Sequence, residues 1–313
     1  MQSGVKLVTV SATAVEAIGV DGIVVVDKPE GWTSHDVVAK MRGIAGTRRV
    51  GHLGTLDPIA TGVLPVMIGQ ATRLAQFFDK SEKAYEAVVR LGFATSTYDR
   101  DGEPSGPVTE PVFSREDIER CLDPMRGAID QQPPPVSAKK IKGVPAYKLV
   151  RKNIPVELSP VRITVHELTV VAVEGARVHL KVRCSTGTYI RSIAHDLGTA
   201  LGCGAHIEIL KRTASGPFGI EQARSVGQLE ELGRAGELAQ AITPAAELLP
   251  EFPAVFVDGV TAARIRQGCD FAASPFRTGA EQRHVKAVGP DGRLVAIGQI
   301  VLPHQYHPIA VFS

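Results

Sequence analysis

Short apolar stretches alternate with polar, glycine-rich connections along most of the chain. Gly22–Asp27 carries three consecutive valines and predicts a buried strand, and Val63–Gly69 predicts another. Lys83–Leu91 mixes β-branched and aromatic residues, which favours a strand as well. Val161–Val173 and Arg177–Cys184 alternate apolar and polar positions and are separated by a short turn. This spacing predicts an antiparallel hairpin.

Helices are indicated by start signals and by a repeat of three to four residues. Thr33 with Asp36, and Ser114 with Asp117, have the spacing of a capping box, which opens a helix. The segment that follows Tyr189 places its apolar residues on one helical face. We therefore expect helices at residues 33–44, 71–78, 114–125, 189–201 and 225–234.

The mixture of strands and helices predicts an α+β protein with a mixed, largely antiparallel central sheet. Residues 1–21 are interpreted as an N-terminal extension and residues 22–249 as the main domain. After Leu249 the composition changes, because prolines and glycines punctuate short strand-like stretches. Those stretches are residues 255–257, 284–288 and 294–301. Residues 250–313 are therefore predicted to form a small, separate β-rich domain.

Composition excludes several classes of protein. The 313 residues are 44% hydrophobic and 22% charged, as in soluble globular proteins and unlike disordered chains. No apolar run approaches the ~20 residues that span a bilayer. The four cysteines form no Cys-x-x-Cys pair, so neither a disulfide framework nor a structural zinc site is expected. Scattered, reduced thiols favour a cytoplasmic location.

Positive charge is concentrated in the middle of the chain. Residues 121–215 contain 14 Lys and Arg against 7 Asp and Glu, although the whole chain has a net charge of only +2. Within this part, Gln131–Asn153 holds three consecutive prolines followed by six basic residues. Such an arm is suited to binding a polyanion. A solvated lysine-rich surface loop is the alternative that charge alone leaves open.

The segment Gly51–Gly69 carries the most informative pattern for chemistry. Its glycines at positions 51, 54 and 62 allow a close approach of the backbone to a ligand. Asp57 precedes Pro58, which restricts its backbone, and His52 lies five residues earlier. A carboxylate held on such a loop is a candidate nucleophile. In the alternative interpretation, Asp57 caps a turn and Pro58 begins a helix.

The sequence GHLGTLDPIATGVLPV, which begins at Gly51, resembles the catalytic motif of a known family. This is the TruB family of bacterial tRNA pseudouridine synthases, which modify uridine-55. Four further stretches resemble family motifs in the same order, and together the similarity covers roughly residues 22–235. These stretches are VVDKPEGWTSHDVV, KAYEAVVRLG, CSTGTYIRSIAHDLGTALGCGAHI and LKRTASGPF.

The resemblance implies a role for each matching residue. Asp57 would be the catalytic nucleophile, and Arg191 would form an ion pair with it. Tyr85 would stack on a flipped-out uracil, with Tyr189 beside it and Leu210 on the opposite wall. His52 would help to hold the nucleotide that leaves the stack, and Lys28 and Pro29 would support the catalytic loop.

The resemblance also implies a fold and partners. It suggests the pseudouridine-synthase fold, with a thumb insertion at about residues 131–153 that closes on the T-arm of tRNA. It suggests a C-terminal domain similar to PUA-type RNA-binding domains. Neither a cofactor nor a metal is expected, because the reaction moves a glycosidic bond from nitrogen to carbon 5 of uracil without oxidation. No protein partner is implied, and a monomer is the default expectation.

Two other functions are compatible with some of these features. A non-catalytic RNA-binding or RNA-remodelling protein would need only the basic arm and stacking aromatic residues. A glycoside hydrolase would need two carboxylates around one bond, whereas Asp57 is the only acidic residue between Gly51 and Gly69. Asp99 could supply the second carboxylate, but nothing in its sequence surroundings singles it out. If the protein is instead a pseudouridine synthase, Arg191 is expected to keep Asp57 ionised by lowering the pKa of Asp57.

Overall fold

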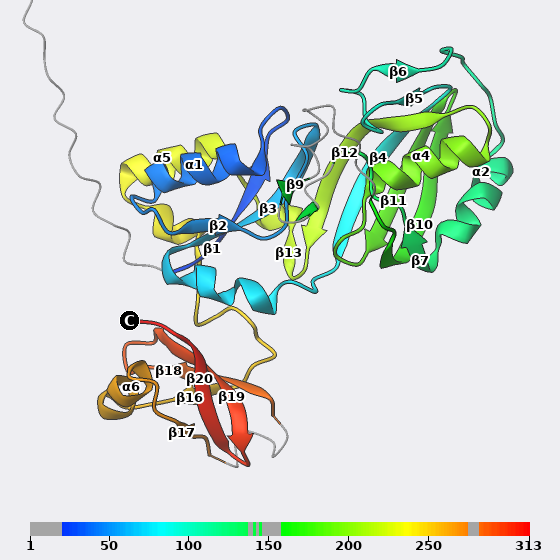
Figure 1. Cartoon of the computed structure of the whole chain (residues 1–313). Coiled ribbons are helices and arrows are strands. Elements are labelled where there is room, and N and C mark those ends of the chain that lie inside the picture. Colours follow the sequence, from blue (N-terminus) through cyan, green and yellow to red (C-terminus); the bar gives the residue numbers. More distant parts are fainter. Residues whose placement is uncertain (1–20, 137–139, 142–143, 146–157, 275–281) are drawn as a thin grey trace, which may run out of the picture.

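A mixed sheet forms the centre of the molecule (Figure 1). The structure is a computed structural model that describes residues 21–136, 140–141, 144–145, 158–274 and 282–313. Within this part, the main sheet has 11 strands, of which eight run in the order β14-β1-β3-β12-β4-β11-β10-β7. Only the pairs β1–β14 and β3–β12 are parallel among its described strands. The strands of the sheet are β1 (Gly22–Lys28), β2 (Val50–His52), β3 (Ala60–Ile68), β4 (Lys83–Leu91), β7 (Gly127–Gln131), β10 (Val161–Glu174), β11 (Arg177–Cys184), β12 (Ala205–Ser215), β13 (Phe218–Gly219), β14 (Arg224–Ser225) and β15 (Thr243–Pro244).

Helices lie beside both halves of this sheet, with α1 and α5 near β1 and with α2 and α4 near β10 and β11 (Figure 1). Their apolar faces contribute Met41, Ile118, Ile193 and Leu197 to one core cluster with the strands. Both predicted capping boxes are present, at Thr33 and at Ser114. The α-helices of this domain are α1 (Ser34–Ile44), α2 (Arg115–Leu122), α4 (Ile190–Ala200) and α5 (Val226–Ala235), and the 3-10 helices are η1 (Gly69–Phe77), η2 (Asp123–Met125), η3 (Ile220–Gln222) and η4 (Leu238–Ala241).

The predicted α+β class and the largely antiparallel central sheet are confirmed. The strand β4 has the predicted bounds, and the hairpin β10–β11 is present. The segment expected as a helix at residues 71–78 is instead the 3-10 helix η1. The connection that follows β4 contains two short paired strands, β5 (Ala94–Thr95) and β6 (Pro104–Ser105).

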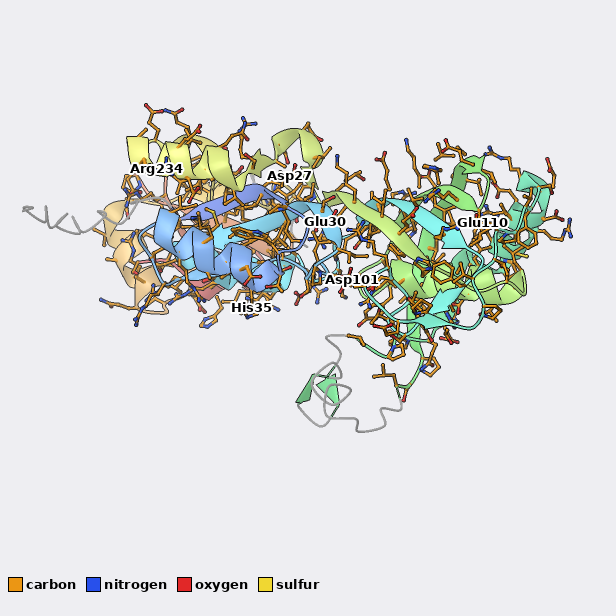
Figure 2. The ribbon with its side chains drawn as sticks, turned by 90° about the horizontal axis from the view of Figure 1, so that it is seen from above. Asp27, Glu30, His35, Asp101, Glu110 and Arg234 are labelled. Atoms are coloured by element: carbon orange, nitrogen blue, oxygen red, sulfur yellow. The ribbon has the colours of Figure 1, made fainter. Side chains whose placement is uncertain are left out.

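The turn between β5 and β6 is tied to the other half of the sheet. Arg100 forms an ion pair with Glu30, which lies in the turn after β1. Figure 2 labels Glu30 and the neighbouring Asp101 at this junction. The contact helps to hold this turn, which carries Asp99, against the turn that follows β1.

A second sheet forms the C-terminal part, with the order β16-β18-β19-β20-β17. Its core is separate, but Leu294, Ile297 and Phe312 also join a cluster with Ile23 and Met67 of the main sheet. This small β domain agrees with the predicted fold class, whereas the domain boundary at residue 250 stays a prediction. The elements are β16 (Ala254–Phe256), α6 (Gly259–Arg266), β17 (Phe271–Ala272), β18 (His284–Val288), β19 (Leu294–Leu302) and β20 (Gln305–Val311).

Most of the predicted basic arm, and nearly all of the predicted N-terminal extension, lie outside the described residues. Of the arm, the structure describes residues 131–136 and the paired strands β8 (Lys140–Ile141) and β9 (Val144–Pro145). Among the described helices, none has the length and apolar character required to cross a membrane.

Candidate active site

Asp57 lies on the loop between β2 and β3, and two side chains from the start of the chain hold this loop. The ammonium group of Lys28 is fully buried and donates to the carbonyl oxygens of Pro29, Trp32 and Pro58, the last at 3.3 Å. The Ser34 hydroxyl accepts from the Leu56 amide at 2.9 Å and donates to the Leu56 carbonyl at 3.2 Å. Both neighbours of Asp57 are therefore fixed by hydrogen bonds.

Arg212 of β12 holds the other side of the same loop. Its guanidinium is buried and donates to the carbonyl oxygens of Val63, Gly54 and Thr55 at 2.7, 3.1 and 3.4 Å. It also makes a side-chain hydrogen bond with Tyr85, which faces it across the β4–β12 pair. Gly62 has a φ of +96°, and a Cβ there would lie 2.2 Å from the Arg212 carbonyl oxygen. Only glycine fits this close parallel pairing.

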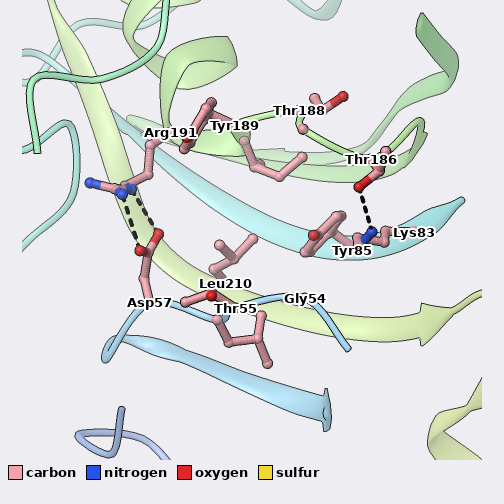
Figure 3. A pocket seen from close by; sticks show the side chains of 13 residues that line it. Gly54, Thr55, Asp57, Lys83, Tyr85, Thr186, Thr188, Tyr189, Arg191 and Leu210 are labelled. Carbon is pink, nitrogen blue, oxygen red and sulfur yellow. Dashed lines mark hydrogen bonds and ion pairs between the residues drawn. The ribbon is translucent and has the colours of Figure 1, made fainter. Parts of the chain in front are cut away.

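Arg191 lies between two carboxylates (Figure 3 shows its pair with Asp57). Its Nε and Nη2 contact the two Asp57 oxygens at 2.9 and 3.1 Å, and its Nη1 lies 3.3 Å from Asp99. It also donates to the carbonyl oxygens of Thr97 and Val136. The Arg191 side chain is only 5% exposed, whereas Asp57 keeps 36% of its side chain exposed. The arrangement leaves Asp57 as the accessible member of the pair.

The electrostatics of these groups follow from burial. Burial raises the pKa of Asp57 above its ordinary value; Arg191 opposes this effect and the Asp99 carboxylate adds to it. The expectation that Arg191 would lower this pKa has the correct sign for that one interaction, but desolvation outweighs it. Burial also raises the pKa of Tyr85 to about 12 and lowers the pKa of Lys28 to about 8. Tyr85 is therefore a neutral phenol at physiological pH.

A cavity of about 220 Å³ joins the residues that the sequence singled out. Asp57, Tyr85, Tyr189, Arg191 and Leu210 all line it, and Figure 3 shows them around one open space. The cavity is smaller than the ~300–1,000 Å³ usual for drug-sized ligands, so it suits a group of nucleobase size. We refer to it as the Asp57 cavity.

His52, the remaining candidate, lines a neighbouring cavity of about 140 Å³ and not the Asp57 cavity. Its ring packs edge-on against His35, with the ring centroids 6.1 Å apart. Burial lowers the pKa of His52, which favours the neutral imidazole. We refer to this second space as the His52 cavity.

Sequence reasoning missed several residues of the site. Lys83 and Arg212 could have been found from strand periodicity, because each lies two positions from a predicted site residue, Tyr85 or Leu210, on the same face of its strand. Gln131 exchanges two hydrogen bonds with the backbone of Tyr189, at 2.8 and 2.9 Å. Asp99 was considered only as a second carboxylate for a glycoside hydrolase, and its contact with Arg191 had no local signal, because the two residues are far apart in the sequence.

No group of three or more His, Cys, Asp or Glu side chains in the described part converges as a metal site. The side chains around Asp57 are instead two aromatic rings, aliphatic side chains, hydroxyl groups and two cations. This set can stack on a planar ring and place one carboxylate against it.

The chain is similar to known proteins. The family model for TruB family pseudouridylate synthases (N-terminal domain) matches residues 42–190, and that for the tRNA pseudouridylate synthase B C-terminal domain matches residues 191–250. A protein of Solibacter usitatus named tRNA pseudouridine synthase B is 58% identical over 93% of this chain and 99% of its own length. A protein of the same name from Thermobifida fusca is 42% identical over 89% of this chain and 94% of its own length.

Solved structures with the same fold include the archaeal box H/ACA sRNP Nop10-Cbf5 complex, with a TM-score of 0.65 and 25% identity over 93% of this chain and 84% of that one. A Cbf5-Nop10-Gar1 complex matches with a TM-score of 0.66 and 28% identity over 96% of this chain and 84% of that one. Together the two family models match residues 42–250, which include four of the five quoted motifs, all except the one at residues 25–38. The chain therefore belongs to the TruB family of pseudouridylate synthases.

Proposed function

We propose that this protein converts uridine-55 in the T-loop of tRNA to pseudouridine, with Asp57 as the nucleophile. The single observation that carries the proposal is the Asp57–Arg191 ion pair, in which each carboxylate oxygen contacts one guanidinium nitrogen and the carboxylate is open to a cavity of nucleobase size. The names of the similar proteins support tRNA as the substrate.

The reaction exchanges one bond for another. The bond between N1 of uracil and C1′ of ribose breaks, a bond between C5 and C1′ forms, the C5 proton leaves and N1 gains a proton. No electron acceptor is needed. Asp57 assists the departure of the base by attack at C1′ or at C6, and the detached ring must stay in the site while it rotates.

The walls of the Asp57 cavity suit this task. The ring of Tyr85 offers a face for stacking, which contributes ~1–3 kcal/mol per base. Leu210, on the adjacent strand β12, adds an aliphatic surface. A uridine inside a folded loop reaches such a cavity only after it leaves the base stack, so we infer that the enzyme flips it out. The basic arm that follows Gln131 is proposed to hold the T-arm by its phosphates.

The decisive experiment measures tritium release from a tRNA transcript labelled at C5 of uridine-55 alone. The wild type should release tritium to water, and Asp57→Asn should lower the rate by at least about 10³-fold, as expected for the loss of a nucleophile. Asp101→Asn is the matched control, because Asp101 is exposed and lies outside both cavities.

Release by Asp57→Asn at the wild-type rate would remove Asp57 from the mechanism. Tight binding of tRNA by the wild type without release would favour the alternative of an RNA-binding protein that does not catalyse. If tritium were released from transcripts labelled at other uridines and not from those labelled at uridine-55, the proposed position would be wrong. The proposed reaction would still stand.

A further inference from the structure

The Asp57 cavity and the His52 cavity meet at one basic residue. Gly54, Lys83 and Thr186 line both spaces. The two cavities therefore adjoin along a common wall, and Lys83 stands at the boundary. Its aliphatic chain passes close to Gly54, where an added Cβ would lie 3.1 Å from the Lys83 Cε.

Lys83 is half-buried and differs from the buried cations near the loop. Its ammonium group donates to the Thr186 hydroxyl at 3.1 Å and to the Ser81 carbonyl at 3.3 Å. An ammonium has three donors, so these contacts leave one for a ligand. Within the described residues no carboxylate forms a salt bridge with Lys83, whereas Arg191 contacts two carboxylates. A partly desolvated cation at the junction of two cavities is suited to an incoming anion.

The His52 cavity itself has polar groups that can recognise a base. His52 has a buried Nδ1 that makes no hydrogen bond with the described residues. Asp79, Ser81 and Ser215 lie on the same walls, and Phe78 adds an aromatic surface. A neutral imidazole offers one donor and one acceptor. At about 140 Å³ the space suits one small group and not an extended ligand.

We propose that the His52 cavity is a second nucleotide subsite, and that Lys83 binds the phosphate linking that nucleotide to the target uridine in the Asp57 cavity. This inference rests on the proposed function. One phosphodiester connects adjacent nucleotides, and the only described basic side chain that lines both cavities is Lys83.

The test measures RNA binding in the Asp57→Asn background, which prevents turnover, with a stem-loop that contains the target. Lys83→Gln should weaken binding roughly 10-fold, because a charged hydrogen bond is lost. It should also reduce the slope of log affinity against log salt by about 0.7–0.9, as for one phosphate. Lys83→Arg should retain both. Lys181→Gln is the matched control, since Lys181 is exposed on the neighbouring strand and lies outside both cavities.

A double-mutant cycle identifies the phosphate. The phosphate on the 5′ or the 3′ side of the target is replaced by an uncharged methylphosphonate. At one of the two positions, this replacement should weaken RNA binding by the protein that retains Lys83. At that position, the replacement should not weaken RNA binding by Lys83→Gln any further. Removal of the base of the corresponding neighbour should weaken binding for the wild type and much less for His52→Ala.

The proposal would be overturned if Lys83→Gln and the methylphosphonate weakened RNA binding additively at both linkages. An unchanged salt slope in Lys83→Gln would overturn it as well. A purely structural lysine would lower the melting temperature without changing the salt slope. If wild-type enzyme released no tritium while the cycle still showed coupling, the proposed function would fail and the subsite would stand. If it released tritium while the cycle showed no coupling, the subsite would fail and the proposed function would stand.

Discussion

The two sides of the catalytic loop are held by different kinds of interaction. On the backbone side, Lys28, Ser34 and Arg212 donate to peptide carbonyls and contact no carboxylate at hydrogen-bond distance in the described part of the chain. On the side-chain side, Arg191 contacts the carboxylates of Asp57 and Asp99. The backbone side therefore fixes where Asp57 lies, and the side-chain side adjusts a pKa that burial raises.

The comparison explains why the site holds so many buried cations. A buried cation that donates to several carbonyl oxygens and to no carboxylate is costly to remove, because those oxygens would lose their partners. Arg212 and Lys28 are of this kind. We call these two residues and Ser34 the frame of the loop. Arg191 is different, since two of its partners are titratable carboxylates and one of these faces the cavity.

The largest effect is expected where the frame is broken. Arg212→Met should reduce the free energy of unfolding by roughly 3 kcal/mol or more, because the carbonyls of Gly54, Thr55 and Val63 lose their donor. Urea unfolding measures this change. Tritium release should also fall strongly, since the loop that carries Asp57 is no longer fixed.

Arg183→Met is the control for that substitution. Arg183 is 47% exposed on β11 and pairs with Glu82 at the surface, where ion pairs contribute ~0–1 kcal/mol. Equal destabilisation by the two variants would mean that Arg212 contributes no more than a surface arginine. The division between frame and titratable pair would then be wrong.

A change of pH dependence is expected where the titratable side is altered. The Asp99 carboxylate contributes to the raised pKa of Asp57, so Asp99→Asn should lower that pKa. Asp57 acts as a nucleophile only when ionised. The acid limb of kcat/KM should therefore move to lower pH in Asp99→Asn.

At neutral pH the same variant should lose between about 10-fold and 100-fold of its activity, because Arg191 keeps only one of the two carboxylates that orient it. Asp101→Asn, two residues further along the same turn, should change neither quantity. An acid limb that stays in place in Asp99→Asn would show that Asp99 does not influence the ionisation of Asp57.

The residues on the two sides of the loop also show which parts of the site could be predicted from the sequence. The carboxylate, its arginine partner and the aromatic wall were predicted, because they lie in motifs that resemble a family. The class of fold followed from hydrophobic periodicity and capping boxes, such as Thr33 with Asp36. Local patterns, however, carry no information on which distant segments meet.

Asp99 and Val136 illustrate this limit. Both contact Arg191, although neither belongs to its helix or to a quoted motif. The direction in which the pKa of Asp57 shifts could not be predicted either. It depends on the balance between burial and the opposite charges of Arg191 and Asp99.

The smallest effect is expected at Ser34, where the frame loses one of several attachments. Ser34→Ala removes both hydrogen bonds to Leu56 and leaves a buried amide and carbonyl without that partner. The free energy of unfolding should fall by about 1–2 kcal/mol. Tritium release should change less than about threefold, because Lys28 and Arg212 still hold the loop on either side of Asp57. A Ser34→Thr variant, which retains the hydroxyl, provides the control. A loss of activity in Ser34→Ala as large as that in Arg212→Met would mean that the loop has a single essential attachment and no distributed frame.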